Sequence, residues 1–122
     1  MLLHLSKGKK ISDVQKAFTD EYPYLKLEFS QPVPGGPAPV ATKKLPGTTS
    51  LKDAGLNIDG FIDIQDDMTV SDLEKILYYD FGLNGQVSRQ SGKLWLETRM
   101  TDKWTLEKQN EHGRELTAPS GQ

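Results

Sequence analysis

Cysteine is absent from the chain, and histidine occurs only twice. The lack of thiols excludes disulfides, thiol chemistry and the common zinc frameworks built on cysteine ligands. With two histidines a Ser-His-Asp triad has little to draw on, and no serine lies in a nucleophile-elbow context. The glycine pair at 35–36 is not followed by the Lys-Ser or Lys-Thr of a phosphate-binding loop. We therefore predict no catalytic residues, no metal site and no cofactor, and we expect a protein that is not an enzyme.

Long apolar runs are also missing. No stretch approaches the roughly 18 apolar residues of a membrane span, and the start, MLLHLSKGKK, lacks the charged region before an apolar core that marks a secretory signal. These absences predict no membrane partner and a cytoplasmic location. The net charge of −2 provides no strong basic surface, so we do not expect nucleic acid as the main partner. The length of 122 residues suits one domain with a packed core.

The clearest element that is present is a helix over 69–82, TVSDLEKILYYDFG. Its apolar residues recur at helical spacing and form one stripe. Thr69 and Asp72 have the spacing of a capping box, and Gly82 can adopt the left-handed conformation that ends a helix. The strand-like segment FIDI, 61–64, precedes this helix.

The chain resembles itself after a shift of 59 residues. The segment LLHL, 2–5, falls on FIDI, and ISDVQK at the start of a helix predicted over 11–22 falls on VSDLEK. In that first helix Ser12 and Gln15 have the spacing of a second capping box. We interpret the similarity as an internal duplication, about 2–31 and 61–90, within a single domain of residues 1–122. Chance is the alternative, since few of the matches are identities.

The remaining segments differ in kind from these two units. Five of the seven prolines lie within 31–57, which we interpret as a Pro/Gly-rich loop, either a functional arm or a tolerated insertion. A capped helical turn is predicted there from Ser50. The predicted strands outside the repeat starts are YLKLEFS (24–30), 85–90 and 93–99, the last two joined by a turn at Ser91-Gly92. Residues 111–122 are predicted to be a polar, frayed tail.

The order β-α-β, long loop, β-α-β-β predicts an α+β fold. Without the final strand it is the ferredoxin-like double βαβ arrangement, in which two helices cover one face of a single antiparallel sheet. Right-handed crossovers would place the first and third strands side by side at its centre. We predict this sandwich with an extra C-terminal strand. A ubiquitin-like β-grasp is the alternative, because 61–83 resembles the strand–helix unit of that family.

Alternation along the strands predicts which side chains lie on the open face of such a sheet. The candidates are His4, Tyr24, Lys26, Glu28, Asp63, Lys93, Trp95 and Arg99. His4 and Asp63 would be cross-strand neighbours, and such a pair can act as acid and base. The alternative is a solvated pair with an interaction energy of about 0–1 kcal/mol.

Trp95 is the centre of the predicted binding surface. Basic residues, including Lys93 and Arg99, alternate with it, and aromatic and basic groups together suit single-stranded nucleic acid. Glu97 and Asp102 interrupt this pattern, and packing of the tryptophan against the body of the protein is another reading. Our leading hypothesis is a non-enzymatic binding or protein-interaction module with an unidentified protein partner, or one that self-associates. The alternatives are weak binding of single-stranded nucleic acid and a small enzyme that uses His4 and Asp63.

The C-terminal half, FGLNGQVSRQSGKLWLETRMTDKWTLEKQNEHG, resembles a family of small uncharacterised proteins from Bacteroidetes bacteria. The resemblance covers most of the chain beyond the Pro/Gly-rich loop. It implies a bacterial origin and a cytoplasmic location. It implies no activity, cofactor or site residue.

Overall fold

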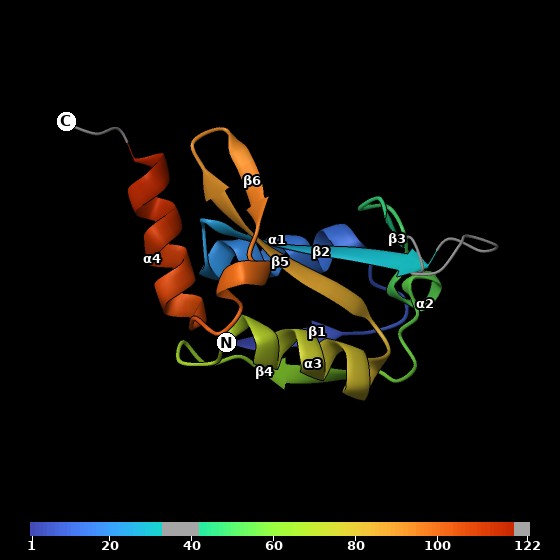
Figure 1. Cartoon of the computed structure of the whole chain (residues 1–122). Coiled ribbons are helices and arrows are strands. Elements are labelled where there is room, and N and C mark those ends of the chain that lie inside the picture. The colour runs from blue at the N-terminus through green and yellow to red at the C-terminus, as the bar shows by residue number, and fades with distance from the viewer. Residues whose placement is uncertain (33–41, 119–122) are drawn as a thin grey trace.

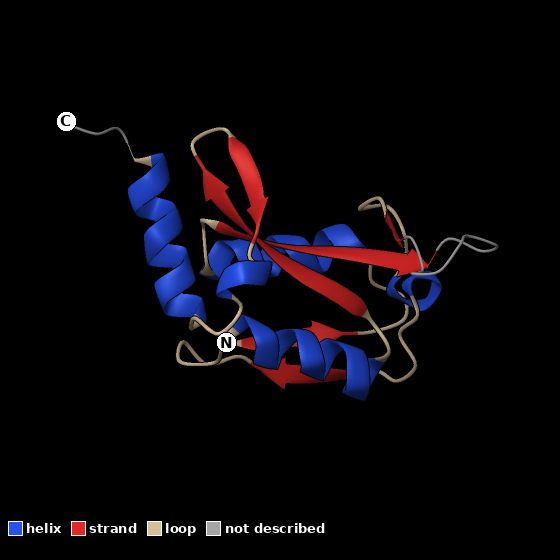
Figure 2. Ribbon diagram, in the orientation of Figure 1, coloured by secondary structure: helices blue, strands red, loops and turns tan. Residues whose placement is uncertain are grey.

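The computed structural model describes residues 1–32 and 42–118, and within them the chain has an α+β fold with four helices and two antiparallel sheets (Figures 1 and 2). The strands are β1 (Leu2–Leu5), β2 (Leu25–Pro32), β3 (Thr42–Lys44), β4 (Gly60–Asp63), β5 (Asn84–Ser91) and β6 (Leu94–Glu97). The helices are α1 (Ile11–Glu21), α2 (Leu51–Ala54), α3 (Val70–Phe81) and α4 (Leu106–Thr117), and a short 3₁₀ helix, η1, spans Arg99–Thr101.

Local signals predicted α3 correctly. The Thr69 hydroxyl accepts a hydrogen bond from the Asp72 amide at 3.0 Å, and the Asp72 carboxylate accepts one from the Thr69 amide at 3.3 Å. Gly82 ends the helix with φ of +76°. The capping box predicted for α1 is wrong, because Lys10 is the N-cap residue and Gln15 points to the neighbouring strand instead.

The strands divide between two sheets, which corrects the expectation of one. The first and third strands of the prediction correspond to β1 and β4. They are antiparallel neighbours as expected, but they form a two-stranded sheet of their own. The other sheet has the order β3-β2-β5-β6, with β2 and β5 paired from Leu25↔Arg89 to Ser30↔Asn84. The two eight-residue strands satisfy each other's main-chain groups along this length.

The apolar faces of the two sheets meet in a shared core with α1 and α3. Leu3 and Leu5 of β1 and Leu27 and Phe29 of β2 are all buried in it. The remaining buried apolar residues come from the four α-helices, from β2, β4 and β5 and from the connecting segments: Ile11, Val14, Phe18, Tyr22, Leu25, Leu51, Ala54, Leu56, Ile62, Ile64, Val70, Leu73, Leu77, Phe81, Leu83, Val87 and Leu106. Since both sheets direct one face inward, each has one face left for solvent or a ligand.

The predicted polar tail is mostly helix α4, which corrects that expectation through Thr117. Its start is capped by Thr105, whose hydroxyl accepts a hydrogen bond from the Lys108 amide at 3.1 Å. Leu106, Gln109 and Gly113 are buried on the inner side. Three buried positions at spacings of three and four residues give a narrow stripe with only one large apolar side chain, which periodicity of apolar residues does not reveal. Residues 119–122 of the predicted tail lie outside the described residues.

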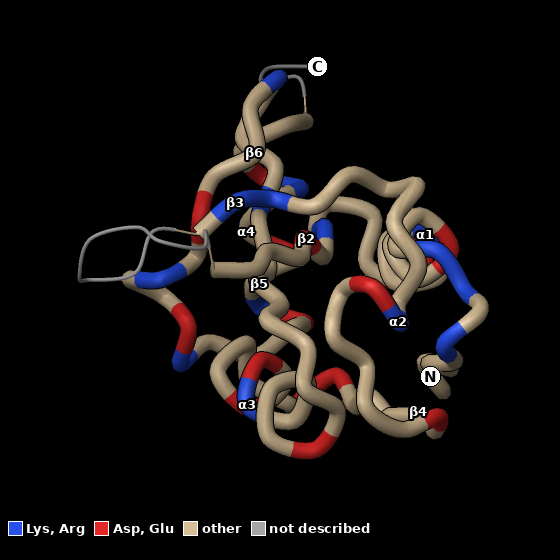
Figure 3. Tube along the Cα trace, turned by 90° about the vertical axis from the view of Figure 1, so that its right-hand side faces the viewer, with Lys and Arg blue, Asp and Glu red and all other residues tan. Residues whose placement is uncertain are grey.

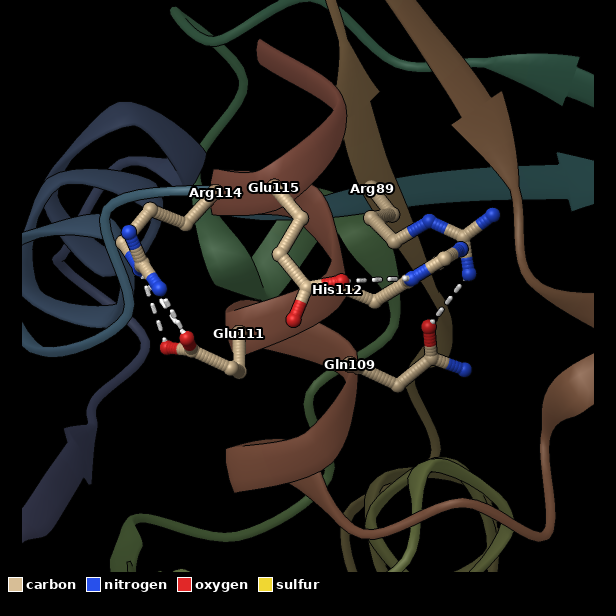
Figure 4. A network of polar contacts seen from close by, with 6 residues as sticks. All are labelled: Arg89, Gln109, Glu111, His112, Arg114 and Glu115. Atoms are coloured by element: carbon tan, nitrogen blue, oxygen red, sulfur yellow. Dashed lines mark hydrogen bonds and ion pairs between the residues drawn. The ribbon is translucent and has the colours of Figure 1, made fainter. Parts of the chain in front are cut away.

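A network of polar side chains holds α4 against β5 (Figure 4). The guanidinium of Arg89 on β5 donates to Gln109 Oε1 at 2.9 Å. The amide of Gln109 donates in turn to the Thr101 carbonyl at 2.7 Å, which ties η1 to the helix. On the outer side His112 lies 3.6 Å from Glu115, and Arg114 pairs with Glu111. Trp104 packs among Arg89, Lys108 and His112, so it belongs to this junction.

The described residues of the loop predicted over 31–57 include two short elements. These are β3, which pairs with the end of β2, and α2, whose N-cap Ser50 accepts a hydrogen bond from the Asp53 amide at 3.1 Å. The predicted capped turn is therefore confirmed. Residues 33–41, which include three of the five prolines of this loop, lie outside the described residues.

Main-chain hydrogen bonds around α1 recur around α3. In the first half these are Ile11 N to Thr49 O, Ser12 N to Gly47 O, Leu51 N to Lys9 O and Lys52 N to Lys7 O. In the second half they are Val70 N to Trp104 O, Ser71 N to Asp102 O, Leu106 N to Met68 O and Glu107 N to Asp66 O. The start of α2 is thus placed against the first unit as the start of α4 is placed against the second.

Candidate functional site

The outward face of the four-stranded sheet carries a row of polar side chains. Cross-strand pairing places Glu28 beside Gln86, Ser30 beside Asn84 and Ser88 beside Glu97. A cleft of about 330 Å³ lies over this face, between β3, β6 and the region where α3 meets η1. Its lining is Glu28, Ser30, Thr42, Lys44, Glu74, Asn84, Gln86, Val87, Ser88, Glu97, Thr98, Arg99 and Asp102.

Three side chains at one end of the cleft form a closed ring of hydrogen bonds. The Asn84 amide donates to Ser30 Oγ at 2.9 Å, Ser30 Oγ donates to Gln86 Oε1 at 3.3 Å, and the Gln86 amide donates to Asn84 Oδ1 at 3.1 Å. Each group thereby fixes the orientation of the next. A ligand in the cleft would meet polar atoms that are already positioned.

Glu28 is a fixed anion in the floor of the cleft. Its carboxylate lies 2.9 Å from Lys44 Nζ and accepts a hydrogen bond from the Ser88 hydroxyl at 2.7 Å. Burial by itself would raise the pKa of Glu28, but Lys44 and Ser88, with a contribution from Lys26, outweigh burial and lower it. Glu28 therefore remains charged at neutral pH.

The side chains of Glu74 and Thr98 bond to main-chain groups of β5 that β6 is too short to reach. Among the described residues no strand continues the ladder beyond Glu97, and both main-chain groups of Val87 bond to side chains instead. Glu74 Oε2 accepts from the Val87 amide at 3.0 Å, and the Thr98 hydroxyl donates to the Val87 carbonyl at 2.7 Å. Burial raises the pKa of Glu74, and the nearby carboxylate of Asp102 raises it further.

Trp95 lies on the same face, toward the tip of the hairpin. Its side chain is 39% exposed, and Lys26 Nζ lies 5.7 Å from the centre of its rings. Trp95 pairs with Gln90, and the next residue on this face of β6 is Glu97, which lines the cleft. The predicted residues Trp95, Lys26 and Glu28 are thus brought together on one face.

The other predicted residues of this surface are dispersed. Arg99 lines the cleft from η1, whereas Lys93 belongs to the hairpin turn. Tyr24 lies under α4: its amide donates to Asn110 Oδ1 at 2.9 Å, and its side chain packs beside Gly113. The placement of Tyr24 on the open face is therefore wrong.

His4 and Asp63 belong to the two-stranded sheet, so they do not share a face with Trp95. Their strands are in a register that sets His4 opposite Phe61 and Asp63 opposite Leu2, which makes the two residues diagonal neighbours. The His4 ring packs 6.1 Å from the ring of Phe61, and Asp63 accepts a hydrogen bond from Gln65. The described clefts are lined by neither residue.

The prediction from the sequence does not include Glu74 or the polar residues of β5 among the site residues. A signal existed in NGQVSRQ, where Asn84, Gln86 and Ser88 alternate with Gly85 and Val87. Such alternation predicts one polar face, but it does not tell which strand lies alongside. The pairing of β5 with β2 supplied that information.

A second hollow of about 380 Å³ lies on the outer side of α4. It is lined by Trp104, Thr105, Glu107, Lys108, Glu111, His112 and Glu115. The Trp104 ring is already covered by Lys108 Nζ, 4.5 Å from its centre. We therefore regard the cleft on the four-stranded sheet as the stronger candidate site.

Comparison of the chain with protein-family models, with curated proteins and with solved structures gave no match. The resemblance of the C-terminal half thus stays a prediction from the sequence. Among residues 1–32 and 42–118 no helix has the length and apolar character to cross a membrane. The same residues contain no group of three or more histidine, aspartate or glutamate side chains arranged to hold a metal ion.

Proposed function

We propose that this protein is a non-enzymatic interaction module that binds a protein partner on the open face of β2, β5 and β6. The observation that carries the proposal is the position of Trp95, a large aromatic side chain that is 39% exposed beside a polar cleft. Tryptophan is enriched among the residues that dominate binding energy at protein interfaces. The neighbouring cleft supplies the oriented polar groups that give such an interface its specificity.

The chemistry of the cleft favours an extended, polar segment of the partner. Amide and hydroxyl groups of Ser30, Asn84, Gln86 and Ser88 can bond to the main chain of such a segment. The cleft holds four carboxylates, from Glu28, Glu74, Glu97 and Asp102, against the two cationic side chains of Lys44 and Arg99. A segment with a basic side chain would complement this balance.

The same charge balance disfavours the alternative of single-stranded nucleic acid. Phosphates bind where cations dominate, and here the carboxylates outnumber the cations. The alternative of a small enzyme depends on His4 and Asp63, which lie away from the described clefts. We accordingly propose a module without a cofactor, located in the cytoplasm.

We also propose that the chain arose by duplication of a β-α-β-β-α unit. The recurrent hydrogen bonds at the starts of α1 and α3 support this proposal. We keep the ferredoxin-like order, with β6 as the additional strand, as a proposal for β1, α1, β2, β4, α3, β5 and β6 alone, and the β-grasp stays the alternative.

The test is affinity capture from a lysate of the natural source cell, with Trp95→Ala beside the wild type. Tyr79→Ala is the matched control, because Tyr79 is an aromatic residue that is 75% exposed on α3. We expect a protein that is retained by the wild type and by Tyr79→Ala and lost by Trp95→Ala. Its binding should shift the amide resonances of β2, β5 and β6. A partner that Trp95→Ala retains, or one that shifts other elements, would contradict the proposal.

A further inference from the structure

The edge strand β6 presents an unpaired, apolar edge to solvent. All four residues of β6 are exposed, including Leu94 at 65% and Leu96 at 39%. β6 is the last strand of its sheet in the described part of the chain, and its hairpin with β5 stands out from the two-stranded sheet (Figure 1). Proteins usually protect such edges with charges, because an open edge is a template for another strand.

The opposite edge of the same sheet has that protection. Two of the three residues of β3 are lysines, and Figure 3 shows this strand as a basic segment. Two copies of β3 would repel each other. β6 instead has Leu94, Trp95 and Leu96 in succession. One charged residue lies at each end of this run, Lys93 just before the strand and Glu97 as its last residue.

The main chain of β6 fixes which residues can pair outward. Gly92, with φ of +62°, and Lys93 form a two-residue turn, so Ser91 and Leu94 are the pair that closes the hairpin. Hydrogen-bonding direction alternates along an antiparallel ladder. The N–H and C=O groups of Trp95 and Glu97 are therefore directed to the free edge.

From these features we propose that β6 pairs with β6 of a second copy, antiparallel and about a two-fold axis at Trp95. In this register Trp95 lies opposite Trp95 of the other copy, and Leu94 opposite Leu96. Lys93, in the turn just before β6, then lies beside Glu97 of the other copy at each end, so the segment KLWLE is complementary to itself. Cross-strand aromatic, apolar and opposite-charge pairs of this kind each stabilise a sheet.

The product is a continuous eight-stranded sheet with both open faces on one side, since the axis runs perpendicular to the sheet. This inference goes beyond the proposed function, because it joins two copies of the chain through the main-chain edge of β6, although the Trp95 side chain of the open face also lies at the two-fold axis. A contact of one short strand is small, so we expect a weak dimer that dissociates on dilution.

The test is sedimentation velocity from about 10 μM to about 1 mM, a range suited to small interfaces. Lys93→Glu and Glu97→Lys should each weaken dimerisation on the order of tenfold, because each places like charges opposite one another twice. The double variant K93E/E97K should restore it. Lys43→Glu, which changes the net charge as Lys93→Glu does but lies on β3, should leave it unchanged.

Hydrogen exchange tests the register separately. The Trp95 amide should become protected as the concentration rises, whereas those of Leu94 and Leu96, which face β5, are protected throughout. A wild type that stays monomeric to about 1 mM, even one that accepts a foreign strand at β6, overturns the inference. So does a dimer that both single variants retain, or one that the double variant fails to restore. Capture of a protein partner by the charge variants is measured in a separate affinity experiment. The proposed function can therefore hold or fail whether or not the chain dimerises through β6.

Discussion

Gln15 of α1 and Glu74 of α3 lie 59 residues apart and bind the main chain of adjacent strands with opposite polarity. Gln15 Nε2 donates to the Leu27 carbonyl at 2.8 Å, whereas Glu74 Oε2 accepts from the Val87 amide at 3.0 Å. Leu27 and Val87 are themselves directly paired across β2 and β5. The two helices are thus fastened to the two sides of one strand pair, one by a donor and the other by an acceptor.

This difference predicts a stabilising change at Glu74. Burial raises the pKa of Glu74, so the folded protein favours the protonated form. The stabilising contribution of that form is complete below the ordinary glutamate pKa and is lost as the pH rises through the raised pKa. In Glu74→Gln the amide oxygen can still accept from Val87, and no charge is buried. We expect this variant to be more stable than the wild type by about 0.5 kcal/mol at neutral pH, a value kept small by solvent screening.

Urea unfolding at about pH 7 and about pH 3 measures this effect as the difference in the free energy of unfolding. The difference between variant and wild type should approach zero in acid, where Glu74 is protonated in both the folded and unfolded states. A variant that is destabilised at both pH values would contradict the assignment of burial as the cause.

The converse change at Gln15 should destabilise the protein. An ionised carboxylate cannot donate to the Leu27 carbonyl, so Gln15→Glu leaves that acceptor unpaired beside a negative charge. We expect a loss of about 1–3 kcal/mol in the free energy of unfolding at neutral pH. Acid should restore part of the loss, since a protonated glutamate regains a donor. Equal effects of the same sign for Gln15→Glu and Glu74→Gln would show that the two contacts are not distinguished by polarity.

Local signals predicted α3 and its caps because the residues that set them, such as Thr69, Asp72 and Gly82, lie within the helix or next to it. The pairing of β2 with β5 depends on residues about 60 positions apart, and alternation in each strand does not name a partner. Alternation therefore predicts the strands themselves, but it also leads to the expectation of a single sheet where two are present.

The similarity between the halves holds at one constant shift only through the first part of each half. Ile11 and Val70 differ by 59, but their hydrogen-bond acceptors, Thr49 and Trp104, differ by 55. The change of shift falls beyond β2, where the first half contains the Pro/Gly-rich loop. For the same reason the sequence predicts a tail where α4 lies, and it predicts Tyr24, which α4 covers, on the open face. The position of Trp95 and Lys26 on one face follows from alternation within each of their strands, which the sequence shows directly.

The ion pair between Glu28 and Lys44 should make stability fall in acid. Although burial acts in the other direction, Lys44 and Ser88 lower the pKa of Glu28 on balance, so its ionised form stabilises the fold. That contribution is present above the ordinary glutamate pKa and is lost as the pH falls through the lowered one. Lys44→Met should cost about 0.5–1 kcal/mol at neutral pH, because the lysine is largely exposed, and less in acid.

The measurement combines urea unfolding with titration of the Glu28 carboxyl carbon by NMR, in which Lys44→Met should raise the pKa of Glu28. Lys43→Met is the matched control on the same strand, since Lys43 has no carboxylate partner among the described residues. If both lysine variants moved the pKa of Glu28 equally, general screening would explain the result better than the ion pair.

Gly113 tests how closely α4 must approach β2 and β5. A methyl group at this position would lie 2.8 Å from Tyr24 Cβ, 3.1 Å from Arg89 Cγ and 3.2 Å from the Tyr24 carbonyl oxygen. Alanine favours a helix over glycine by about 1 kcal/mol, so propensity alone predicts stabilisation. The close contacts oppose it, because two of the three atoms belong to the Tyr24 main chain or lie next to it. We expect Gly113→Ala to displace α4 and to destabilise the protein by about 1–3 kcal/mol.

Thermal unfolding followed by tryptophan fluorescence measures this change, because Trp104 lies at the junction between α4 and Arg89. Gly8→Ala is the control, since no heavy atom lies within 4 Å of the added methyl group there. A displaced α4 should also weaken the hydrogen bond between Arg89 and Gln109, and the Arg89 side-chain resonances report it. If Gly113→Ala proved as stable as the wild type, helix propensity would outweigh packing at this junction, and the contact of α4 with Tyr24 would be looser than the distances indicate.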